Sequence, residues 1–291
     1  MIKKFLSLIF IVLIASSCQK AEDPFAPYTD DINVFRNDSK TLDLDLHSGE
    51  YLLADLSEHD ILYENLCDLV IYPASLTKVM TMDTVLHHVS DLSERSSISY
   101  EQINALIAED ATIAYLKGNC EYTVEDLLYA LILPSGADGA VALENLFEEK
   151  GMDLVEEMNA LAESMGCQST HFMNPTGLHD PDHYTSLHDL FLIITDVLAY
   201  EEGRKILETV EYTLEDGLKV ESTLKPLCEM ETAILGGKTG YTPEAGQSIL
   251  VLFRSGNRSY LLLLGNAMGS YTRKEYWHFE DTVHIFEALF Q

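Results

Sequence analysis

The sequence predicts an α+β fold in which an antiparallel sheet, built from both ends of the chain, is flanked by helices and joined to a central helical lobe. Two observations predict it: short apolar runs separated by turn residues occur near both ends, and longer apolar stretches with helical spacing lie between them. The chain has 291 residues and is 47% hydrophobic, so it is long and apolar enough to bury a large core.

The N-terminal residues have the features of an export signal. Basic residues precede an apolar run from Phe5 to Ala15, which is too short to span a bilayer, and small residues then lead into Cys18. The segment resembles a bacterial lipoprotein signal, so we expect residues 1–17 to be removed and Cys18 to be acylated. An ordinary signal peptide with an incidental cysteine is the alternative.

Residues 18–39 are polar and show little periodicity, which predicts a flexible tether before a domain that spans residues 40–291. Apolar runs at 51–56 and 61–63 lie on either side of the polar segment 57–60, and this pattern predicts a β-hairpin.

A helix is expected to begin near Ser75, because Leu76, Val79, Leu86 and Val89 recur at spacings near 3.6. The helical lobe is expected over about residues 90–200. Its apolar stretches are 127–133, 141–147, 154–165 and 190–198.

The last part of the chain returns to strands. Runs at 249–253 and 260–264 flank the turn segment 254–258 and predict a second hairpin, and apolar residues in 280–290 predict a closing helix.

The composition excludes some functions. The formal net charge is -30, which disfavours binding to nucleic acids and docking of a basic patch on anionic membranes. The remaining cysteines form no Cys-x-x-Cys pair, and the sequence is compatible both with disulfide bonds and with free thiols. These cysteines are Cys67, Cys120, Cys167 and Cys228.

A serine and a lysine three residues apart at a helix start form the first candidate for chemistry. Ser75 and Lys78 lie on one helical face, so the amine can take the hydroxyl proton. The spacing alone is a weak signal, since about one such pair is expected by chance, and the pairs Ser17/Lys20 and Ser222/Lys225 have no suitable helix after them.

Two further motifs strengthen this candidate. Ser135 lies in a turn after a predicted helix, and Lys238-Thr-Gly-Tyr-Thr242 precedes the late hairpin. In this order, the three motifs resemble the superfamily of serine penicillin-binding proteins and β-lactamases. Longer matches at Pro73–Lys78 and Asn174–Leu178, among others, resemble the low-molecular-weight D-alanyl-D-alanine carboxypeptidases.

The resemblance implies the β-lactamase/DD-peptidase-like fold and a role for each matching residue. Ser75 would be the nucleophile, Lys78 its base with a lowered pKa, and Ser135 a proton relay to the leaving amine. The third motif would bind substrate: Lys238 and Thr239 the terminal carboxylate, Gly240 and Thr242 along the strand edge. The backbone N–H groups of Ser75 and Tyr241 would form the oxyanion hole.

The sequence departs from the family pattern at one position. The second motif normally reads Ser-x-Asn, but here Ala137 replaces the asparagine. The amide that contacts both the substrate and the base is therefore absent, and Asp138 would raise rather than lower the pKa of Lys78.

A group of histidines and a group of aromatic residues are both expected to be structural rather than functional. His179, His183 and His188 are not expected to bind a metal, because Pro181 interrupts any helix between the first two. The aromatic cluster from Tyr271 to Trp277, with Phe279, is expected to pack in the core, although a membrane or glycan contact is the alternative.

The resemblance therefore implies a serine D-Ala-D-Ala carboxypeptidase that trims peptidoglycan stem peptides, is acylated by β-lactam antibiotics and uses no cofactor or metal. We expect an exported monomer that the lipid on Cys18 anchors to the membrane on the envelope side, with no C-terminal β domain. The alternatives are a weak or inactive penicillin-binding lipoprotein and a class A-like β-lactamase. The last is disfavoured because 171–175 lacks the deacylating glutamate.

Overall fold

The structure is a computed structural model that describes residues 36–291. The expected signal peptide (1–17) and the acylated Cys18 lie outside the described residues. Of the expected tether, only 36–39 are described, and they belong to the first strand, β1 (Arg36–Lys40), which pairs in parallel with β3 (Asp60–Asn65). The sheet therefore begins a few residues before the boundary expected at residue 40.

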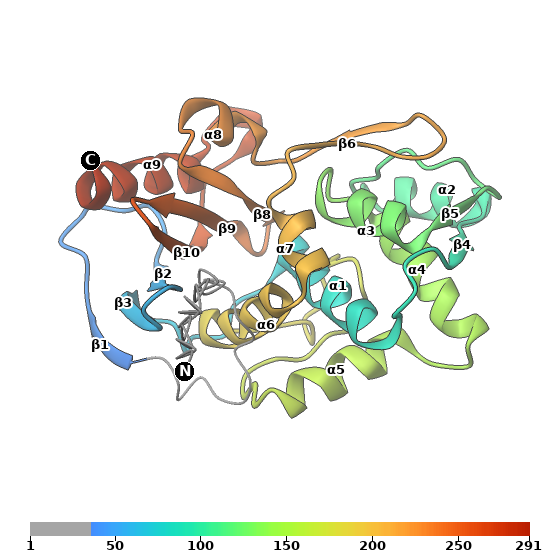
Figure 1. The fold of residues 1–291 in the computed structure, drawn as a ribbon, viewed down its shortest axis with the longest axis horizontal. Helices are drawn as coiled ribbons and strands as arrows, with labels where there is room; N and C mark the ends of the chain where they lie inside the picture. Colours follow the sequence, from blue (N-terminus) through green and yellow to red (C-terminus); the bar gives the residue numbers. More distant parts are fainter. Residues whose placement is uncertain (1–35) are drawn as a thin grey trace, which may run out of the picture.

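One sheet of six strands joins the two ends of the described chain, as predicted (Figure 1). Its order is β1-β3-β2-β10-β9-β8. The remaining strands of this sheet are β2 (Glu50–Asp55), β8 (Ile234–Thr242), β9 (Gly246–Ser255) and β10 (Arg258–Ala267). The β2–β3 and β9–β10 hairpins are both present and confirm the predicted pair. They meet where β2 pairs antiparallel with β10.

The central strands are buried on both faces, and alternate side chains pack in opposite directions. Leu261 and Leu263 of β10 join the core under the helical lobe, whereas Leu262 and Leu264 join a second core. The second core is closed by α9 (Trp277–Phe290), the helix predicted at 280–290.

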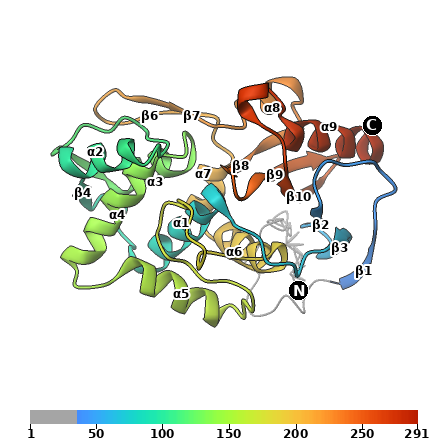
Figure 2. The same ribbon diagram turned by 180° about the vertical axis from the view of Figure 1, so that it is seen from behind.

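The helical lobe packs on the other face of the sheet, where Figure 2 shows α1 and α6 beside one another. Its helices are α1 (Thr77–His88), α2 (Tyr100–Ala108), α3 (Val124–Ile132), α4 (Ala137–Glu149), α5 (Leu154–Ser164), α6 (Leu187–Ala199) and α7 (Glu201–Leu207). A short helix, α8 (Lys225–Met230), precedes β8.

Two small sheets lie outside the predicted elements. They are the pairs β4 (Arg95–Ser97) with β5 (Glu121–Thr123) and β6 (Glu211–Thr213) with β7 (Lys219–Glu221). Each strand has three residues, which is too short to show an alternating pattern.

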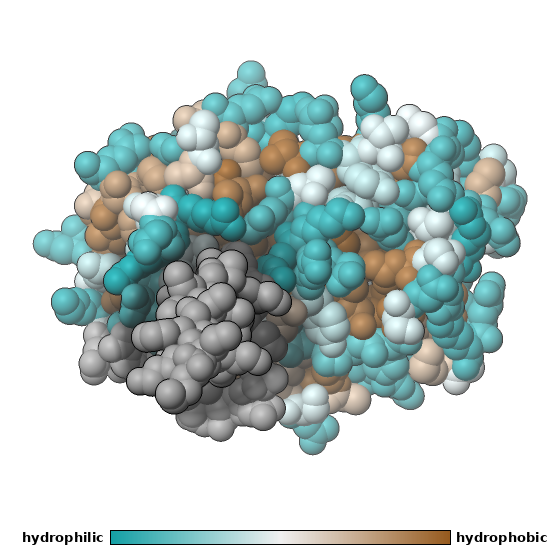
Figure 3. All heavy atoms as spheres, viewed as in Figure 1, coloured by the Kyte–Doolittle hydropathy of each residue, from teal (hydrophilic) through white to brown (hydrophobic). Residues whose placement is uncertain are grey.

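Hydrophilic side chains cover much of the face shown in Figure 3, in keeping with the acidic composition. Within residues 36–291, no helix combines the length and apolar character needed to cross a bilayer. All four cysteines of this part of the chain are free thiols.

Candidate active site

Ser75 and Lys78 meet at the start of α1, as their spacing predicts. Ser75 lies in a single 3₁₀ turn, Ala74–Leu76, that leads directly into α1, and Lys78 lies in the first turn of the helix. The buried Lys78 Nζ donates a hydrogen bond of 3.1 Å to Ser75 Oγ. The hydroxyl therefore has a possible proton acceptor within direct reach once the amine is neutral.

Burial makes a neutral Lys78 accessible near physiological pH. Removal of the amine from water lowers its pKa from 10.5 to about 7, and the carboxylate of Asp138 opposes this shift. Because Asp138 acts to raise the pKa, burial is the dominant cause.

A second contact of Lys78 was not foreseen. Its Nζ also donates to the backbone carbonyl of Thr176. Asn174 shapes the loop that presents this carbonyl, because its side-chain oxygen accepts hydrogen bonds from the N–H groups of Thr176 and Gly177. The motif Asn174–Leu178 was noted in the sequence as family-like, but a backbone contact cannot be assigned from residue types.

Gly177 is required where this loop touches the nucleophile segment. It has φ +77°, and a Cβ atom at this position would lie 1.9 Å from the carbonyl oxygen of Ala74. The glycine thus lets the loop pack directly against the residue before Ser75.

His183 supports α1 from behind the site. Its Nδ1 accepts from the N–H of Met173 at 3.2 Å, so Nε2 carries the proton and donates to Thr77 Oγ1 at 2.8 Å. Burial lowers the pKa of His183 to about 4, which keeps this ring neutral. This hydrogen bond fixes Thr77, and Thr77 is the residue directly before Lys78.

Ser135 reaches the site from the turn between α3 and α4. It is 5% exposed, and its Oγ has no hydrogen-bond partner among the described residues. Its φ of +66° is uncommon for a residue other than glycine and marks a constrained turn. A buried hydroxyl without a partner is suited to a contact made only when substrate is bound.

The residues after Ser135 explain the consequence of the altered motif. Ala137 is buried at the first position of α4 and offers no polar side chain. Asp138 accepts hydrogen bonds from the N–H groups of Ala114 and Leu116, so it holds the adjacent loop rather than replacing the missing amide.

Lys238 and Thr239 lie on β8, the edge strand of the sheet. Lys238 is fully buried and donates to the carbonyl of Thr239, and burial together with the charge of Lys78 lowers its pKa. Gly240 lets β8 approach the nucleophile segment, because a Cβ there would lie 2.9 Å from the carbonyl oxygen of Pro73. The third motif is therefore brought to Ser75.

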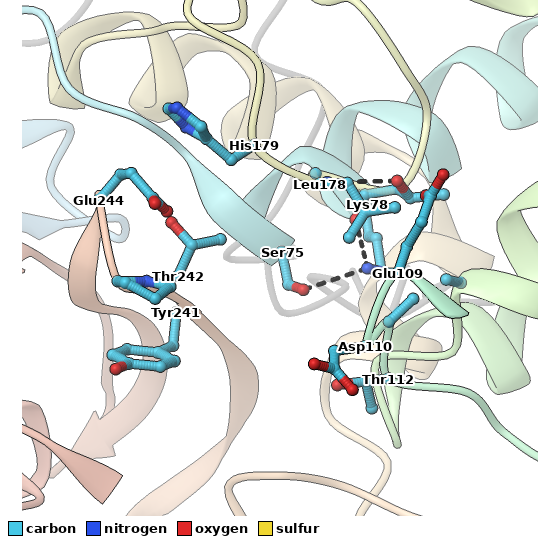
Figure 4. Close-up of a pocket in the computed structure, with 15 residues that line it drawn as sticks. Ser75, Lys78, Glu109, Asp110, Thr112, Leu178, His179, Tyr241, Thr242 and Glu244 are labelled. Atoms are coloured by element: carbon cyan, nitrogen blue, oxygen red, sulfur yellow. Dashed lines mark hydrogen bonds between the residues drawn. The ribbon is translucent and has the colours of Figure 1, made fainter. Parts of the chain in front are cut away.

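Two hollows meet at Ser75 and Tyr241. The first has a volume of about 620 Å³, and it is lined by Lys78, Ala137 and the loop around Thr176. Figure 4 shows Tyr241, Thr242 and Glu244 on the side opposite Glu109 and Asp110. The rim of this hollow thus carries acidic side chains from two sides.

The second hollow, of about 740 Å³, corrects the interpretation of the aromatic cluster. Tyr271, Tyr276 and Phe279 line it together with Ser135 and Thr239, so the prediction of core packing is wrong for Tyr271 and Tyr276. The ring of Tyr271 packs edge-on against Tyr241, with 4.8 Å between ring centroids, and this contact turns the segment toward the site. Only Phe279 also packs against the core under α9.

The three noted histidines lie in different places. His179 packs edge-on against Tyr72, His183 contacts Thr77, and His188 lies between Glu64 and Asp68. Among the described residues, His188 belongs to one group that could hold a metal, with Glu64 and Cys67, but no such group combines two of these three histidines.

A sequence profile of the D-alanyl-D-alanine carboxypeptidase family, peptidase S11, matches residues 36–264. The chain belongs to the S11 family. The resemblance to low-molecular-weight penicillin-binding proteins is therefore confirmed.

Curated S11 relatives include D-alanyl-D-alanine carboxypeptidase DacF of Bacillus subtilis, which is 26% identical over 81% of this chain and 61% of the relative. D-alanyl-D-alanine carboxypeptidase DacA of Haemophilus influenzae is 27% identical over 77% of this chain and 58% of the relative. The chain thus spans about three fifths of the length of these two relatives.

Solved structures show the same fold. The DD-transpeptidase of Streptomyces K15 superposes with a TM-score of 0.75 at 22% identity, covering 85% of this chain and 98% of that one. A D-alanyl-D-alanine carboxypeptidase of Mycobacterium tuberculosis gives a TM-score of 0.73 at 23% identity, covering 87% and 95%. The predicted α+β class of the DD-peptidase/β-lactamase type is confirmed.

Proposed function

We propose that this S11 protein is a serine D-Ala-D-Ala carboxypeptidase that removes the terminal D-alanine from peptidoglycan stem pentapeptides. The observation that carries the proposal is the contact between the buried Lys78 amine and Ser75 Oγ at 3.1 Å. A pKa of about 7 makes this lysine a usable base at neutral pH.

The reaction begins with transfer of the Ser75 proton to Lys78. Ser75 Oγ then attacks the carbonyl carbon between the two D-alanines, and the peptide bond breaks to give an acyl-enzyme and free D-alanine. Lys78 returns this proton through Ser135 to the leaving amine, and the Ser135 hydroxyl has no other described partner. Water then attacks the ester on Ser75 and releases the shortened peptide.

The edge strand β8 positions the substrate. Thr239 and the nearby Lys238 bind the terminal carboxylate, and the extended stem lies along Gly240 to Thr242. The N–H groups of Ser75 and Tyr241 stabilise the oxyanion. One such donor lowers the activation free energy by about 3 kcal/mol.

The altered second motif is compatible with turnover. Lys78 has two hydrogen-bond acceptors, Ser75 Oγ and the Thr176 carbonyl, so its position does not depend on the missing amide. The substrate, however, loses one positioning contact at Ala137, which lowers the rate rather than removing the chemistry. A weak or inactive penicillin-binding lipoprotein remains the second candidate on this observation.

The further expectations about the whole chain are part of the same proposal. We propose a lipid anchor on Cys18, a tether between this residue and β1, a monomeric domain and a location at the membrane on the envelope side. Support comes from the signal-like sequence at 1–17 and from the substrate class that the names of the relatives indicate. Labelling with radioactive palmitate, lost in Cys18→Ala, tests the anchor.

Labelling with a fluorescent penicillin tests the nucleophile. Wild-type protein is expected to be labelled, and Ser75→Ala is expected to lose the label because no hydroxyl remains to be acylated. Ser222→Ala is a matched control, since Ser222 has the same spacing to Lys225 but lines neither hollow. Equal labelling of wild type and Ser75→Ala would contradict the proposal.

Release of D-alanine from a stem pentapeptide separates the candidate functions. Release that depends on Ser75 supports the carboxypeptidase. Labelling without release supports the binding lipoprotein, and rapid hydrolysis of nitrocefin supports the β-lactamase.

A further inference from the structure

A group of polar side chains lies between α1 and α6, on the part of α1 that leads away from Ser75. Asp83 and His87 are one helical turn apart on α1, and Asp196 faces them from α6. One ligand atom of each residue lies within 4.8 Å of the others. None of the three residues lines either hollow of the candidate active site.

Asp83 has an environment that the rest of the fold does not explain. Its side chain is 0% exposed, and neither carboxylate oxygen has a hydrogen-bond partner among the described residues. The ionisable groups next to it are the like-charged Asp196 and the His87 ring, whose Nε2 lies 3.9 Å from Asp83 Oδ1. A buried carboxylate in this setting is costly unless a proton or a cation neutralises it.

The distances suit a cation between the two helices. His87 Nε2 lies 2.6 Å from Asp196 Oδ2 and 3.9 Å from Asp83 Oδ1. Ligands bound tetrahedrally at about 2.1 Å from a zinc ion lie about 3.4 Å from one another. Both distances from His87 Nε2 therefore differ from this spacing by less than about 1 Å.

We propose that Asp83, His87 and Asp196 bind a divalent zinc ion that joins α1 to α6. One imidazole nitrogen and two carboxylate oxygens are a suitable donor set, and a water molecule completes the coordination. Access for this water exists because the side chains of His87 and Asp196 are 32% and 30% exposed. The site is structural: the ion fixes α1, the helix that directly follows the turn with Ser75, and takes no part in the reaction.

The surroundings favour this site over the other metal-like group, formed by Glu64, Cys67 and His188. There, both ring nitrogens of His188 are paired with carboxylates, Glu64 and Asp68. In the first group, by contrast, His87 Nε2 is hydrogen-bonded to Asp196, and the buried carboxylate of Asp83 accepts no hydrogen bond from the described residues. Cys67 is held as a thiol, because its Sγ donates to the Tyr51 carbonyl and burial raises its pKa to about 12. This second group therefore needs no ion, and His188 serves as a control position.

Zinc binding to the full chain, stripped of metal with a chelator, tests the proposal. Competition with a zinc-binding dye is expected to show one tight site per chain, which Asp83→Asn weakens at least about tenfold, since even loss of a residue behind a ligand costs this much. Asp196→Asn, at a more exposed position, is expected to do the same if Asp83→Asn does not fold. His88→Gln and His188→Gln are expected to bind zinc as the wild type does.

Thermal unfolding gives a second readout that does not depend on activity. Zinc at about one hundred times its dissociation constant is expected to raise the Tm of the wild type by about 5 °C or more, and to leave the Tm of Asp83→Asn unchanged. Unaltered zinc binding in both aspartate variants, loss of binding in His188→Gln alone, or no binding to the wild type would overturn the proposal. Penicillin labelling of Ser75 does not enter these measurements, so the two proposals fail separately.

Discussion

The lowered pKa of Lys78 predicts how acylation depends on pH. With a pKa of about 7, about half of the lysine is neutral at pH 7, whereas at the ordinary value of 10.5 only about one molecule in three thousand would be. If the neutral amine is the base, the rate constant for acylation of Ser75 is expected to fall about tenfold per pH unit below pH 6 and to level off above pH 8.

The assay is the second-order rate constant for labelling by a fluorescent penicillin between pH 5 and pH 10. Lys78→Arg is expected to slow labelling at least about a thousandfold, because a guanidinium is not deprotonated in this range. Lys225→Arg is the matched control, since Lys225 pairs with Glu211 and Glu221 at the surface. A flat profile, or a midpoint near pH 10, would refute the assignment of Lys78 as a buried base.

The same shift affects stability. The folded chain binds the Lys78 proton less tightly than the unfolded chain, so this group makes the free energy of unfolding rise as the pH increases from about 7 to about 10.5. Below about pH 7 both states hold the proton, and the contribution of Lys78 no longer changes.

Three further substitutions test other parts of the site and fold. Ala137→Asn restores the amide of the family pattern and is expected to raise the acylation rate about tenfold, the value of one positioning contact; an unchanged or lower rate would contradict this. Gly177→Ala is expected to destabilise the fold by about 2 kcal/mol or more in urea unfolding and to slow labelling, whereas Gly151→Ala, with a similar φ and open space, should cost about 1 kcal/mol. Asp281→Ala leaves two backbone N–H groups and a hydroxyl without their acceptor and is expected to cost about 3 kcal/mol; a loss below about 1 kcal/mol would show that water replaces it.

Elements with a strong periodic pattern could be predicted from the sequence. The hairpin around 254–258 and the helix after Ser75 have apolar residues at strand and helix spacing, and both are present. The approach of Lys78 to Ser75 followed from helix geometry alone. In each case the decisive contacts lie within a few residues of one another.

The sheet that joins the two chain ends was predicted, but individual contacts between distant residues could not be. The contact of Lys78 with the Thr176 carbonyl involves a backbone atom of a loop almost one hundred residues away. The burial of Asp83 against Asp196 depends on how α1 packs on α6, which no local pattern reveals. The sequence predicts Tyr271 in the core, but the residue lines the second hollow. An aromatic side chain has the same sequence pattern in a core and at the wall of a pocket.

The pairing of β2 with β10 has a consequence for synthesis of the protein. Leu53 faces Leu262 across this junction, so the sheet cannot close until more than two hundred further residues have left the ribosome after Leu53. Such distant pairing slows folding, because a long loop must close before its contacts form. A nascent chain of this kind stays unfolded for longer, which is the state that the proposed export of this protein would require during passage through a secretion channel.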